Sequence, residues 1–274
     1  MLFDQNRRRA ERICRRISGR RVTMIRAKKA GRKIASVILA AAILVTAAAP
    51  AWASSETMPF RDVKEGDWYY DAASFMYEKG LMNGTSPDEF SPDTFITKEM
   101  FVTMLGRLAE KEGAAIREEI NPLVHLQDIR QSDYSRDYVY WADAVGITPP
   151  VTQKGWSVDK DTQQQEEFYY WQPDEWIFRE QTAYMMSAFA DELNITMPET
   201  VNLRLEDFAD YDRFRDRLIW DGSDEALERC VRAGILKGYP TGMLVMGDMG
   251  HNWVTRAEAA QMIYNMCEIL GIDA

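Results

Sequence analysis

The chain has 274 residues, of which 33 are Lys or Arg and 43 are Asp or Glu, giving a formal net charge of −10. Residues 1–53 hold 13 of the basic residues and 2 of the acidic ones, which leaves a net charge near −21 on the rest. Nonspecific nucleic-acid binding needs a positive surface, so this charge excludes that class of function. The two histidines lie far apart, with no cluster of cysteines or carboxylates, so we expect no metal and no other cofactor.

The N-terminal segment has the pattern of a secretory signal. Residues 7–33 are rich in Arg and Lys, residues 34–49 are uncharged and apolar, and Ala51-Trp52-Ala53 places small residues where signal peptidase reads. The apolar run of roughly 16 residues is shorter than the ~20 that a retained membrane anchor needs. The sequence therefore predicts a signal peptide over residues 1–53, secretion to the cell wall and surface, and no membrane span after cleavage. Met24 is an alternative start that would give a signal of more ordinary length.

Three stretches of the remaining chain resemble one another. Each opens with an apolar-x-Asp-apolar motif: Phe60-Arg61-Asp62-Val63, Leu126-Gln127-Asp128-Ile129 and Phe208-Ala209-Asp210-Tyr211. An amphipathic stretch follows and ends in a glycine, at Gly80, Gly146 and Gly234. After a loop comes a second helical stretch, which opens at Ile96-Thr97-Lys98-Glu99, Ile177-Phe178-Arg179-Glu180 and Val254-Thr255-Arg256-Ala257. This recurrence, at intervals of roughly 65–80 residues, predicts three copies of one helical unit.

Local capping and apolar patterns support two helices in each unit. In the first copy, Asp67 is expected to cap a helix that begins at Trp68 and ends at Gly80. Thr97 is expected to cap the second helix, and in the third copy Thr255 forms a capping box with Glu258. The expected buried stripes are Trp68, Ala72, Phe75 and Met76 in the first helix and Phe101, Met104, Leu105 and Leu108 in the second. Paired methionines are expected to fill the core: Met100 with Met104, Met185 with Met186, and Met262 with Met266.

Neither helix pair can bury its own apolar stripe, so the copies must pack together. We predict a mostly α fold in which three helix-loop-helix units pack as a pseudo-threefold bundle with long loops. The copies span residues 54–110, 120–195 and 204–274, and the second contains an insertion at residues 148–168. Cys230 and Cys267 each lie on an apolar helix face, either as buried thiols or as a disulfide between the two helices.

These motifs resemble the S-layer homology repeat. Its pattern runs from Phe-x-Asp-Val and Trp, through a helix ending in Gly-Ile and a Gly-rich loop with Phe-x-Pro, to Thr-Arg-Ala-Glu. The first copy matches at Phe60, Asp62, Val63, Trp68, Gly80, Gly84, Phe90, Pro92 and Thr97. The third copy keeps Gly234-Ile235, Gly238-Tyr239-Pro240 and Thr255-Arg256-Ala257-Glu258, and the second copy is the weakest match. The resemblance implies a pseudo-threefold assembly of repeats whose first helices form a central bundle.

The resemblance also implies noncovalent attachment to secondary cell-wall polysaccharide, often through a pyruvylated sugar, in grooves between neighbouring repeats. A pyruvyl ketal carries a carboxylate, which suits a helix start that also offers an Arg. The polysaccharide-binding residues implied by position are Arg256 and Thr255 with Gly238 and Tyr239, then Lys98 and Thr97 with Gly84 and Thr85, and finally Arg179. Two grooves depart from the family pattern, because Lys98 lacks the guanidinium fork and Phe178 replaces the capping Thr.

Some of these residues also have a purely structural interpretation. Asp62, Asp128 and Asp210 are expected to hold turns and helix starts rather than to touch a ligand. Both Thr caps would be needed with or without a bound sugar. Arg256 lies in a first helical turn, where its charge opposes the helix dipole, so it should have some other reason to be there.

Aromatic residues of the second copy, Tyr169, Tyr170, Trp171 and Trp176, could form a platform for a sugar ring. However, Trp171-Gln172-Pro173 occupies the Phe-x-Pro position of the repeat. We therefore expect Trp171 to pack inward.

No catalytic pattern stands out in the sequence, which has no His-based dyad or triad, no His-Glu-x-x-His motif and no nucleophilic Cys or Ser setting. We therefore expect a noncatalytic module that anchors to secondary cell-wall polysaccharide, with other surface-layer proteins as further partners. The alternative is a diverged module that acts in protein–protein interaction or surface assembly. Lys98, Phe178 and the insertion at residues 148–168 favour that alternative.

Overall fold

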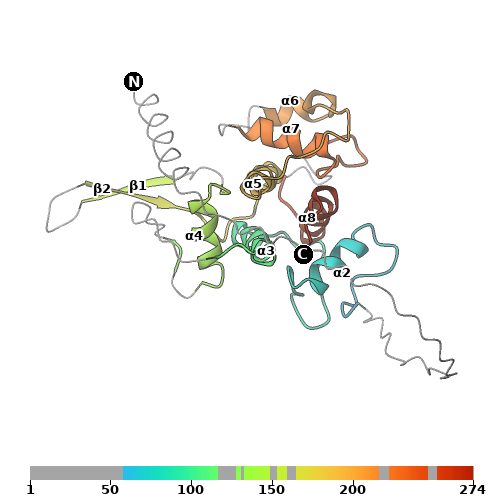
Figure 1. Ribbon diagram of the computed structural model, residues 1–274, viewed down its shortest axis with the longest axis horizontal. Coiled ribbons are helices and arrows are strands. Elements are labelled where there is room, and N and C mark those ends of the chain that lie inside the picture. Colours follow the sequence, from blue (N-terminus) through green and yellow to red (C-terminus); the bar gives the residue numbers. More distant parts are fainter. Residues whose placement is uncertain are drawn as a thin grey trace, which may run out of the picture. The chain divides into compact units, whose positions relative to one another are not determined.

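The structure is a computed structural model, and it describes residues 58–116, 128–130, 133–148, 153–158, 165–215, 222–245 and 252–273. The predicted signal peptide lies outside these residues. Contacts group Ser54–Ala274 into one unit. The fold is mostly α, as predicted, and Figure 1 shows its elements: α2 (Tyr70–Glu78), α3 (Lys98–Lys111), α4 (Arg136–Ala144), β1 (Gln153–Val158), β2 (Gln165–Tyr170), α5 (Arg179–Glu192), a 3-10 turn (Leu205–Asp207), α6 (Tyr211–Phe214), α7 (Ser223–Ala233) and α8 (Arg256–Leu270).

The first helix of each predicted copy ends where the sequence places its glycine. Gly80, Gly146 and Gly234 have φ of 63°, 80° and 81°, the left-handed region that other residues adopt only at a cost. The residue after each glycine, which is Leu81, Ile147 or Ile235, is fully buried. The glycine therefore stops the helix and returns an aliphatic side chain to the core.

Each first helix packs against a second helix from a different segment of the chain. α2 lies on α8, α4 on α3, and α7 on α5. In Figure 1, α3, α5 and α8 lie near one another at the centre, with α2, α4 and α7 outside them. The expectation that the first helices form the centre is therefore wrong. The physical reason is burial, since nine of the 14 residues of α3 are buried but only three of the nine in α2.

A closed ring of backbone hydrogen bonds joins the segments just before the three central helices. Ile96 N–H donates to Val254, Val254 N–H to Ile177, and Ile177 N–H to Ile96, with N···O distances of 3.0, 3.1 and 3.0 Å. The first residue of each central helix, two positions further along the chain, also donates a backbone hydrogen bond to another segment. The N–H groups of Lys98, Arg179 and Arg256 each donate, at 2.9 Å, to a carbonyl of another segment. These bonds satisfy helix-start donors that an isolated helix would leave unpaired.

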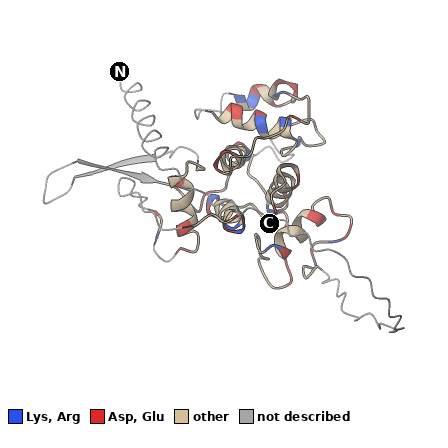
Figure 2. Ribbon diagram, viewed as in Figure 1, with Lys and Arg blue, Asp and Glu red and all other residues tan. Residues whose placement is uncertain are grey.

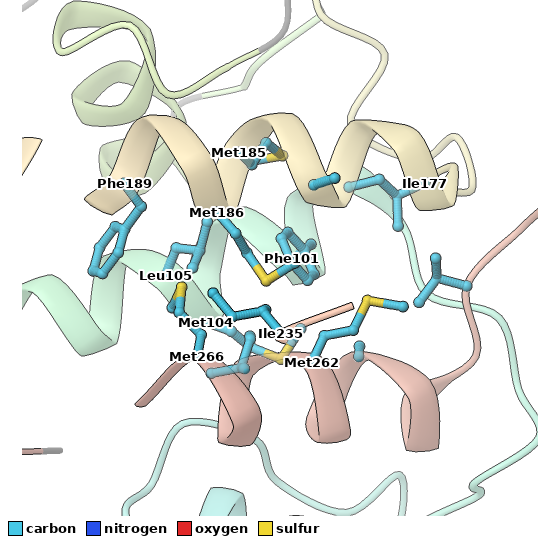
Figure 3. Packing of buried hydrophobic residues seen from close by; sticks show 14 of the residues in the cluster. Phe101, Met104, Leu105, Ile177, Met185, Met186, Phe189, Ile235, Met262 and Met266 are labelled. Atoms are coloured by element: carbon cyan, nitrogen blue, oxygen red, sulfur yellow. The ribbon is translucent and has the colours of Figure 1, made fainter. Parts of the chain in front are cut away.

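The core between α3, α5 and α8 is rich in methionine. Figure 3 shows Met186 of α5 pointing toward Phe101 and Met104 of α3 and toward Met262 and Met266 of α8, and Met185 of α5 belongs to the same buried cluster. Met100 is the exception among the paired methionines, because it is 37% exposed. The prediction that Met100 fills the core is therefore wrong. All four residues of the predicted stripe of the second helix are buried: Phe101, Met104, Leu105 and Leu108.

The start of the first helix also differs from the prediction. Helix α2 begins at Tyr70 rather than Trp68, and Tyr69 occupies its N-cap without a side-chain cap bond. The Asp67 carboxylate instead accepts from Lys64 N–H at 2.8 Å, closing the preceding turn. Trp68 is therefore held on this turn and is 63% exposed, contrary to the prediction that it is buried.

The predicted insertion at residues 148–168 contains regular structure that was not expected from the sequence. Strands β1 and β2 form a two-stranded antiparallel sheet, with Gln153 opposite Tyr170 and Val158 opposite Gln165. As expected, Trp171, which follows β2, is buried. The long insertion therefore leaves the inward-packing position of the Phe-x-Pro motif in place.

Cys230 and Cys267 are both free and buried, so the alternative of a disulfide between them is not realised. Burial raises the pKa of each thiol to about 12. The Cys230 thiol lies 3.4 Å from the carbonyl oxygen of Ala183 on α5. The two cysteines thus serve as core side chains, as their apolar helix faces indicated.

Charges of both signs lie side by side on α6 and α7 (Figure 2). The Arg229 guanidinium of α7 donates two hydrogen bonds to the Asp191 carboxylate of α5, at 2.9 and 2.7 Å. Arg232 pairs with Glu199 at 2.6 Å. Exposed ion pairs of this kind stabilise a fold by only about 0–1 kcal/mol each. The first pair joins α7 to α5, and the charges of both pairs are matched within the protein.

Candidate functional site

The aspartates of the three opening motifs make one contact in common. Asp62 accepts from the N–H groups of Phe90 and Ser91, at 2.8 and 2.7 Å. Asp128 and Asp210 accept in the same way from two consecutive N–H groups, those of Trp171 and Gln172 and those of Leu244 and Val245. The expectation that these aspartates hold turns is confirmed. Burial acts to raise the pKa of Asp62, but the two N–H bonds outweigh it and leave the pKa below its ordinary value.

The threonines expected as caps are confirmed. Thr97 Oγ1 accepts from Met100 N–H, and Thr255 Oγ1 accepts from Glu258 N–H at 3.3 Å. The Glu258 carboxylate in turn accepts from Thr255 N–H at 2.9 Å, which completes the predicted capping box. At the equivalent start of α5, Phe178 has no capping oxygen, but its N–H donates to Gln181 Oε1 at 3.0 Å. That half of a capping box is a signal that the sequence analysis missed.

Arg256 reaches the loop of the first segment. Its Nε donates to the carbonyl of Phe90 at 2.6 Å and its Nη2 to that of Asn83 at 2.5 Å, while the guanidinium lies 4.9 Å from the Phe90 ring centroid. The residue is only 8% exposed, and this burial lowers its pKa even though the nearby Asp62 charge acts to raise it. The structure thus pairs Arg256 with the loop that contains Gly84, not with Gly238 and Tyr239.

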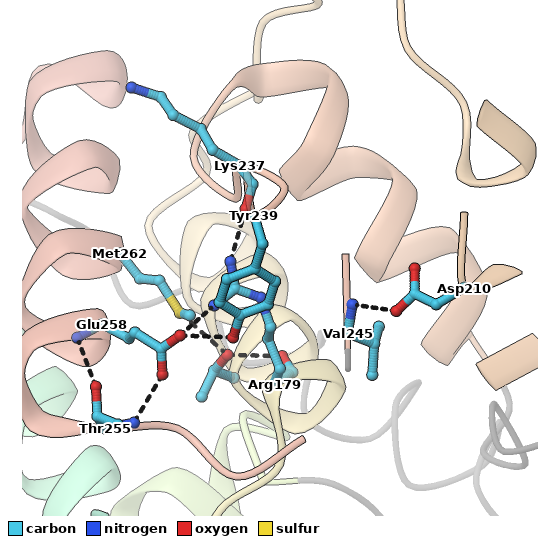
Figure 4. A network of polar contacts seen from close by, with 9 residues as sticks. Arg179, Asp210, Lys237, Tyr239, Val245, Thr255, Glu258 and Met262 are labelled. Atoms are coloured by element: carbon cyan, nitrogen blue, oxygen red, sulfur yellow. Dashed lines mark hydrogen bonds and ion pairs between the residues drawn. The ribbon is translucent and has the colours of Figure 1, made fainter. Parts of the chain in front are cut away.

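Arg179 makes the equivalent contact with the loop of the third segment (Figure 4). Its Nη2 donates to the carbonyl of Lys237 at 2.6 Å, and its guanidinium lies 4.7 Å from the Tyr239 ring centroid. Glu258 lies 3.5 Å from Arg179 Nη1 and also accepts from the Tyr239 hydroxyl at 2.5 Å. Gly238 and Tyr239 therefore belong with Arg179, whose charge is matched by Glu258.

Lys98 completes the set by reaching the second segment. Its Nζ lies 3.0 Å from Glu175 Oε2, and its side chain is only 10% exposed. Gln172 Nε2 donates to the other oxygen of Glu175 at 2.8 Å. Each helix-start cation therefore contacts the loop of a different segment, and Lys98, like Arg179, has its charge matched by a carboxylate.

The loop glycines are required by close packing. A Cβ added to Gly84 would come closer than 3.0 Å to the Phe60 ring and to two backbone carbonyls, and one added to Gly238 would lie 2.7 Å from the Phe208 ring. In the first and third segments, the aromatic residue that opens the motif therefore packs closely against the glycine of its own loop. Thr85 is exposed, and its Oγ1 lies 2.6 Å from Ser91 Oγ. These contacts give Gly84 and Gly238 a structural role whatever binds nearby.

An open pocket of about 310 Å³ lies beside Arg256 and Gly84. One wall of the pocket is formed by residues that share one face of α3: Met100, Thr103, Met104 and Arg107. Tyr134, which is 58% exposed, lines the pocket from the segment that precedes α4. Arg107 Nη1 donates to the carbonyl of Leu81 at 3.2 Å. Of the predicted site residues, this pocket brings together Gly84 and Arg256.

Two pocket residues were missed by the sequence analysis. The position of Arg107 could have been found from helical spacing, since it lies three and four residues beyond Met104 and Thr103 on one face of α3. Tyr134 gives no local signal, because only the tertiary fold brings it to α3. Although much of this residue is exposed, partial burial together with the charge and hydrogen bond of Glu99 raises the pKa of Tyr134 to about 12, so its hydroxyl stays protonated at neutral pH.

Among the described residues, no group of three or more His, Cys, Asp and Glu side chains is arranged to hold a metal ion. The same residues contain no helix both long and apolar enough to cross a membrane. The pocket lining offers guanidinium, amide and aromatic groups.

Comparison with known proteins gives the pocket a context. Residues 59–99 match the S-layer homology domain. This match covers the first segment from its opening motif to the start of α3, including Asn83 and Gly84. S-layer homology domains are noncatalytic modules for cell-surface anchoring, and the match indicates a cell-surface location.

Two curated relatives each match about a fifth of the chain. An endoglucanase of Bacillus sp. (strain KSM-635) is 38% identical over 53 residues, which are 19% of this chain and 6% of that protein. A surface-layer 125 kDa protein of Lysinibacillus sphaericus is 39% identical over 54 residues, 20% of this chain and 5% of its own length. The chain thus corresponds to a small part of each relative, and the S-layer homology domain is one module of such larger proteins.

Proposed function

We propose that this chain is an exported, noncatalytic anchor that binds an acidic, pyruvylated secondary cell-wall polysaccharide. We further propose that its three segments are diverged S-layer homology repeats. The match over residues 59–99 supports surface attachment. The aspartate contact made by Asp62, Asp128 and Asp210, and the backbone ring through Ile96 and its two counterparts, support three repeats of one design.

The observation that carries the proposal is the charge of Arg256. Within the part of the chain that the structure describes, Lys98 and Arg179 each have a carboxylate within 4 Å, and Arg256 has none. Its bonds go to neutral carbonyls, which use two of the five N–H donors of a guanidinium. An almost buried cation beside an open pocket, with no described carboxylate within 4 Å of it, favours an anionic ligand.

The pocket supplies the other groups that an acidic sugar needs. Arg107 adds a second guanidinium on the α3 wall, and no ion pair joins it to a carboxylate among the described residues. A ketal carboxylate between two guanidiniums would gain charge-assisted hydrogen bonds, each worth about 1.5–3 kcal/mol. The exposed ring of Tyr134 gives the sugar an apolar face to lie against.

The other two helix starts are expected to bind weakly or not at all. Tyr239 and Glu258 occupy the space around Arg179, and Glu175 holds Lys98. An incoming carboxylate would have to displace an anion already in place. We therefore assign the working groove to the pocket that joins α3, the loop at residues 81–84 and the start of α8.

Cosedimentation of the full chain with purified host walls tests the proposal. The full chain is expected to pellet with untreated walls and to stay in solution with walls stripped of secondary polysaccharide. Arg107→Ala and Tyr134→Ala should reduce pelleting, because both side chains line the pocket. Arg61→Ala is the matched control, since Arg61 is an exposed arginine of the same segment that does not line this pocket. Equal pelleting with both kinds of wall would contradict polysaccharide binding and direct the search to a protein partner.

A further inference from the structure

All three central helices are preceded by an aromatic residue at the same position. Phe95, Trp176 and Trp253 each lie three residues before the first residue of α3, α5 or α8. The next residue in each case, which is Ile96, Ile177 or Val254, is fully buried. Side chains alternate along extended backbone, so the aromatic rings lie on the side of the backbone ring away from the core.

The three rings pack against one another. Their centroids are 5.3 Å apart for Phe95 and Trp176, 5.5 Å for Phe95 and Trp253, and 4.5 Å for Trp176 and Trp253. The rings are tilted or edge-on to each other, so no cage opens between them for an inserted group. Trp176 is 45% exposed, and none of the three rings is buried. We call this cluster the aromatic triad.

The charges around the aromatic triad are acidic. Asp93, Asp174 and Glu175 flank Phe95 and Trp176 in sequence and are exposed. The cations that follow the three rings in sequence, Lys98, Arg179 and Arg256, are all buried, and the Lys98 ammonium is held by Glu175. An anionic group would be repelled here, in contrast to the pocket beside Arg256. A neutral ligand with hydroxyl donors suits this surface, because carboxylates accept hydrogen bonds from hydroxyls while the ring carries the apolar contact.

We propose that the aromatic triad is a second carbohydrate-binding surface, on which Trp176 stacks against sugar rings that carry no acidic group. This inference rests on the proposed function, because it places the neutral part of the same wall polymer on the triad. Two weak contacts with one long polymer reinforce each other, so each can be modest on its own. The triad would then hold the polymer chain while the Arg256 pocket reads its acidic substituent.

The test uses secondary wall polysaccharide from the host, treated with mild acid to remove ketal-linked pyruvate. Binding of the full chain to this neutral polymer is measured by calorimetry, beside binding to the untreated polymer. Trp176→Leu keeps an apolar side chain against Phe95 and Trp253 but removes the aromatic face. We expect it to weaken binding of the neutral polymer by about fivefold or more, with an unchanged melting temperature.

Trp68→Leu is the matched control, because Trp68 is 63% exposed and its ring contacts only Tyr69 among the described aromatic residues. It should bind the neutral polymer as the unaltered chain does. Unchanged binding in Trp176→Leu, or no binding of the neutral polymer by the unaltered chain, would overturn the inference. Either result leaves the proposed function standing if the untreated polymer still binds through Arg107. Dimers that form in the unaltered chain but not in Trp176→Leu, with equal polymer binding, would place a second copy on the triad and would also overturn it.

Discussion

Arg256 Nη2 donates to the carbonyl oxygen of Asn83 at 2.5 Å, although the two residues lie 173 positions apart in the chain. The bond ties the start of the last helix to the loop of the first segment. Together with the ring of backbone hydrogen bonds through Ile96, it joins the first and last segments of the described chain. The first and last segments are therefore expected to fold as one cooperative unit.

Replacing Arg256 should destabilise the fold. In Arg256→Ala the carbonyls of Phe90 and Asn83 lose their donors and the Phe90 ring loses its cation, so we expect a loss of about 2–4 kcal/mol in the free energy of unfolding. Urea unfolding followed by circular dichroism measures it. Arg61→Ala, at an exposed arginine, should change the same quantity by less than about 0.5 kcal/mol. Equal effects of the two changes would show that the bonds from Arg256 contribute little.

Acid should weaken the turn that Asp62 holds. Because the pKa of Asp62 is lower in the folded chain than its ordinary value, its stabilisation is fully present above that ordinary value, about 3.9, and is lost as the pH falls through the folded one. Asp62→Asn should be less stable at neutral pH and lose less stability in acid. Melting temperatures between neutral pH and the acid range would show this. A variant whose loss in acid matches that of the unaltered chain would contradict the assignment, and Asp71→Asn, at an exposed site, serves as the control.

The Gly84 position should not accept a side chain. A Cβ there would overlap the Phe60 ring and the loop carbonyls, and overpacking of this kind usually costs about 1–3 kcal/mol. Gly84→Ala is therefore expected to lower the melting temperature and to weaken wall binding. Thr85→Ala, one residue along the same loop, removes an exposed hydroxyl and should leave the melting temperature nearly unchanged. Equal melting temperatures of the two variants would show that the close approach of Phe60 does not exclude a side chain at position 84.

Both cysteines of the described part of the chain should be unreactive. Since burial raises the pKa of Cys230 and Cys267 to about 12, almost no thiolate forms at pH values near neutrality. Alkylation by iodoacetamide, located by peptide mass mapping, is expected to be slow at both residues in the native chain and rapid in urea. Rapid native labelling of either cysteine, or a mapped disulfide between them, would contradict the burial described above.

The sequence predicted most of what depends on neighbours along the chain. Gly80 and its counterparts end helices because only glycine adopts their backbone at no cost, and the caps of Thr97 and Thr255 depend on residues three positions away. Trp68 was placed wrongly because apolar spacing does not reveal that Asp67 closes a turn before the helix begins.

Properties set by tertiary structure were beyond reach of the sequence. Nothing local indicates that Arg256 contacts the first segment rather than the loop of its own segment, or that Tyr134 lines the pocket beside it. The same long-range packing decides which of Lys98, Arg179 and Arg256 has no described carboxylate in contact with it. The repeat pattern could identify the candidate cations but could not rank them.

Calorimetric titration of the full chain with purified secondary wall polysaccharide, before and after removal of its ketal-linked pyruvate, tests the central claim most directly. The unaltered chain should bind the intact polymer roughly tenfold or more tightly than the stripped one, and Arg107→Ala should bind both equally and weakly. Arg61→Ala should match the unaltered chain. Equal affinity of the unaltered chain for both polymers, or an Arg107→Ala variant that still distinguishes them, would contradict recognition of an acidic sugar in the pocket beside Arg256.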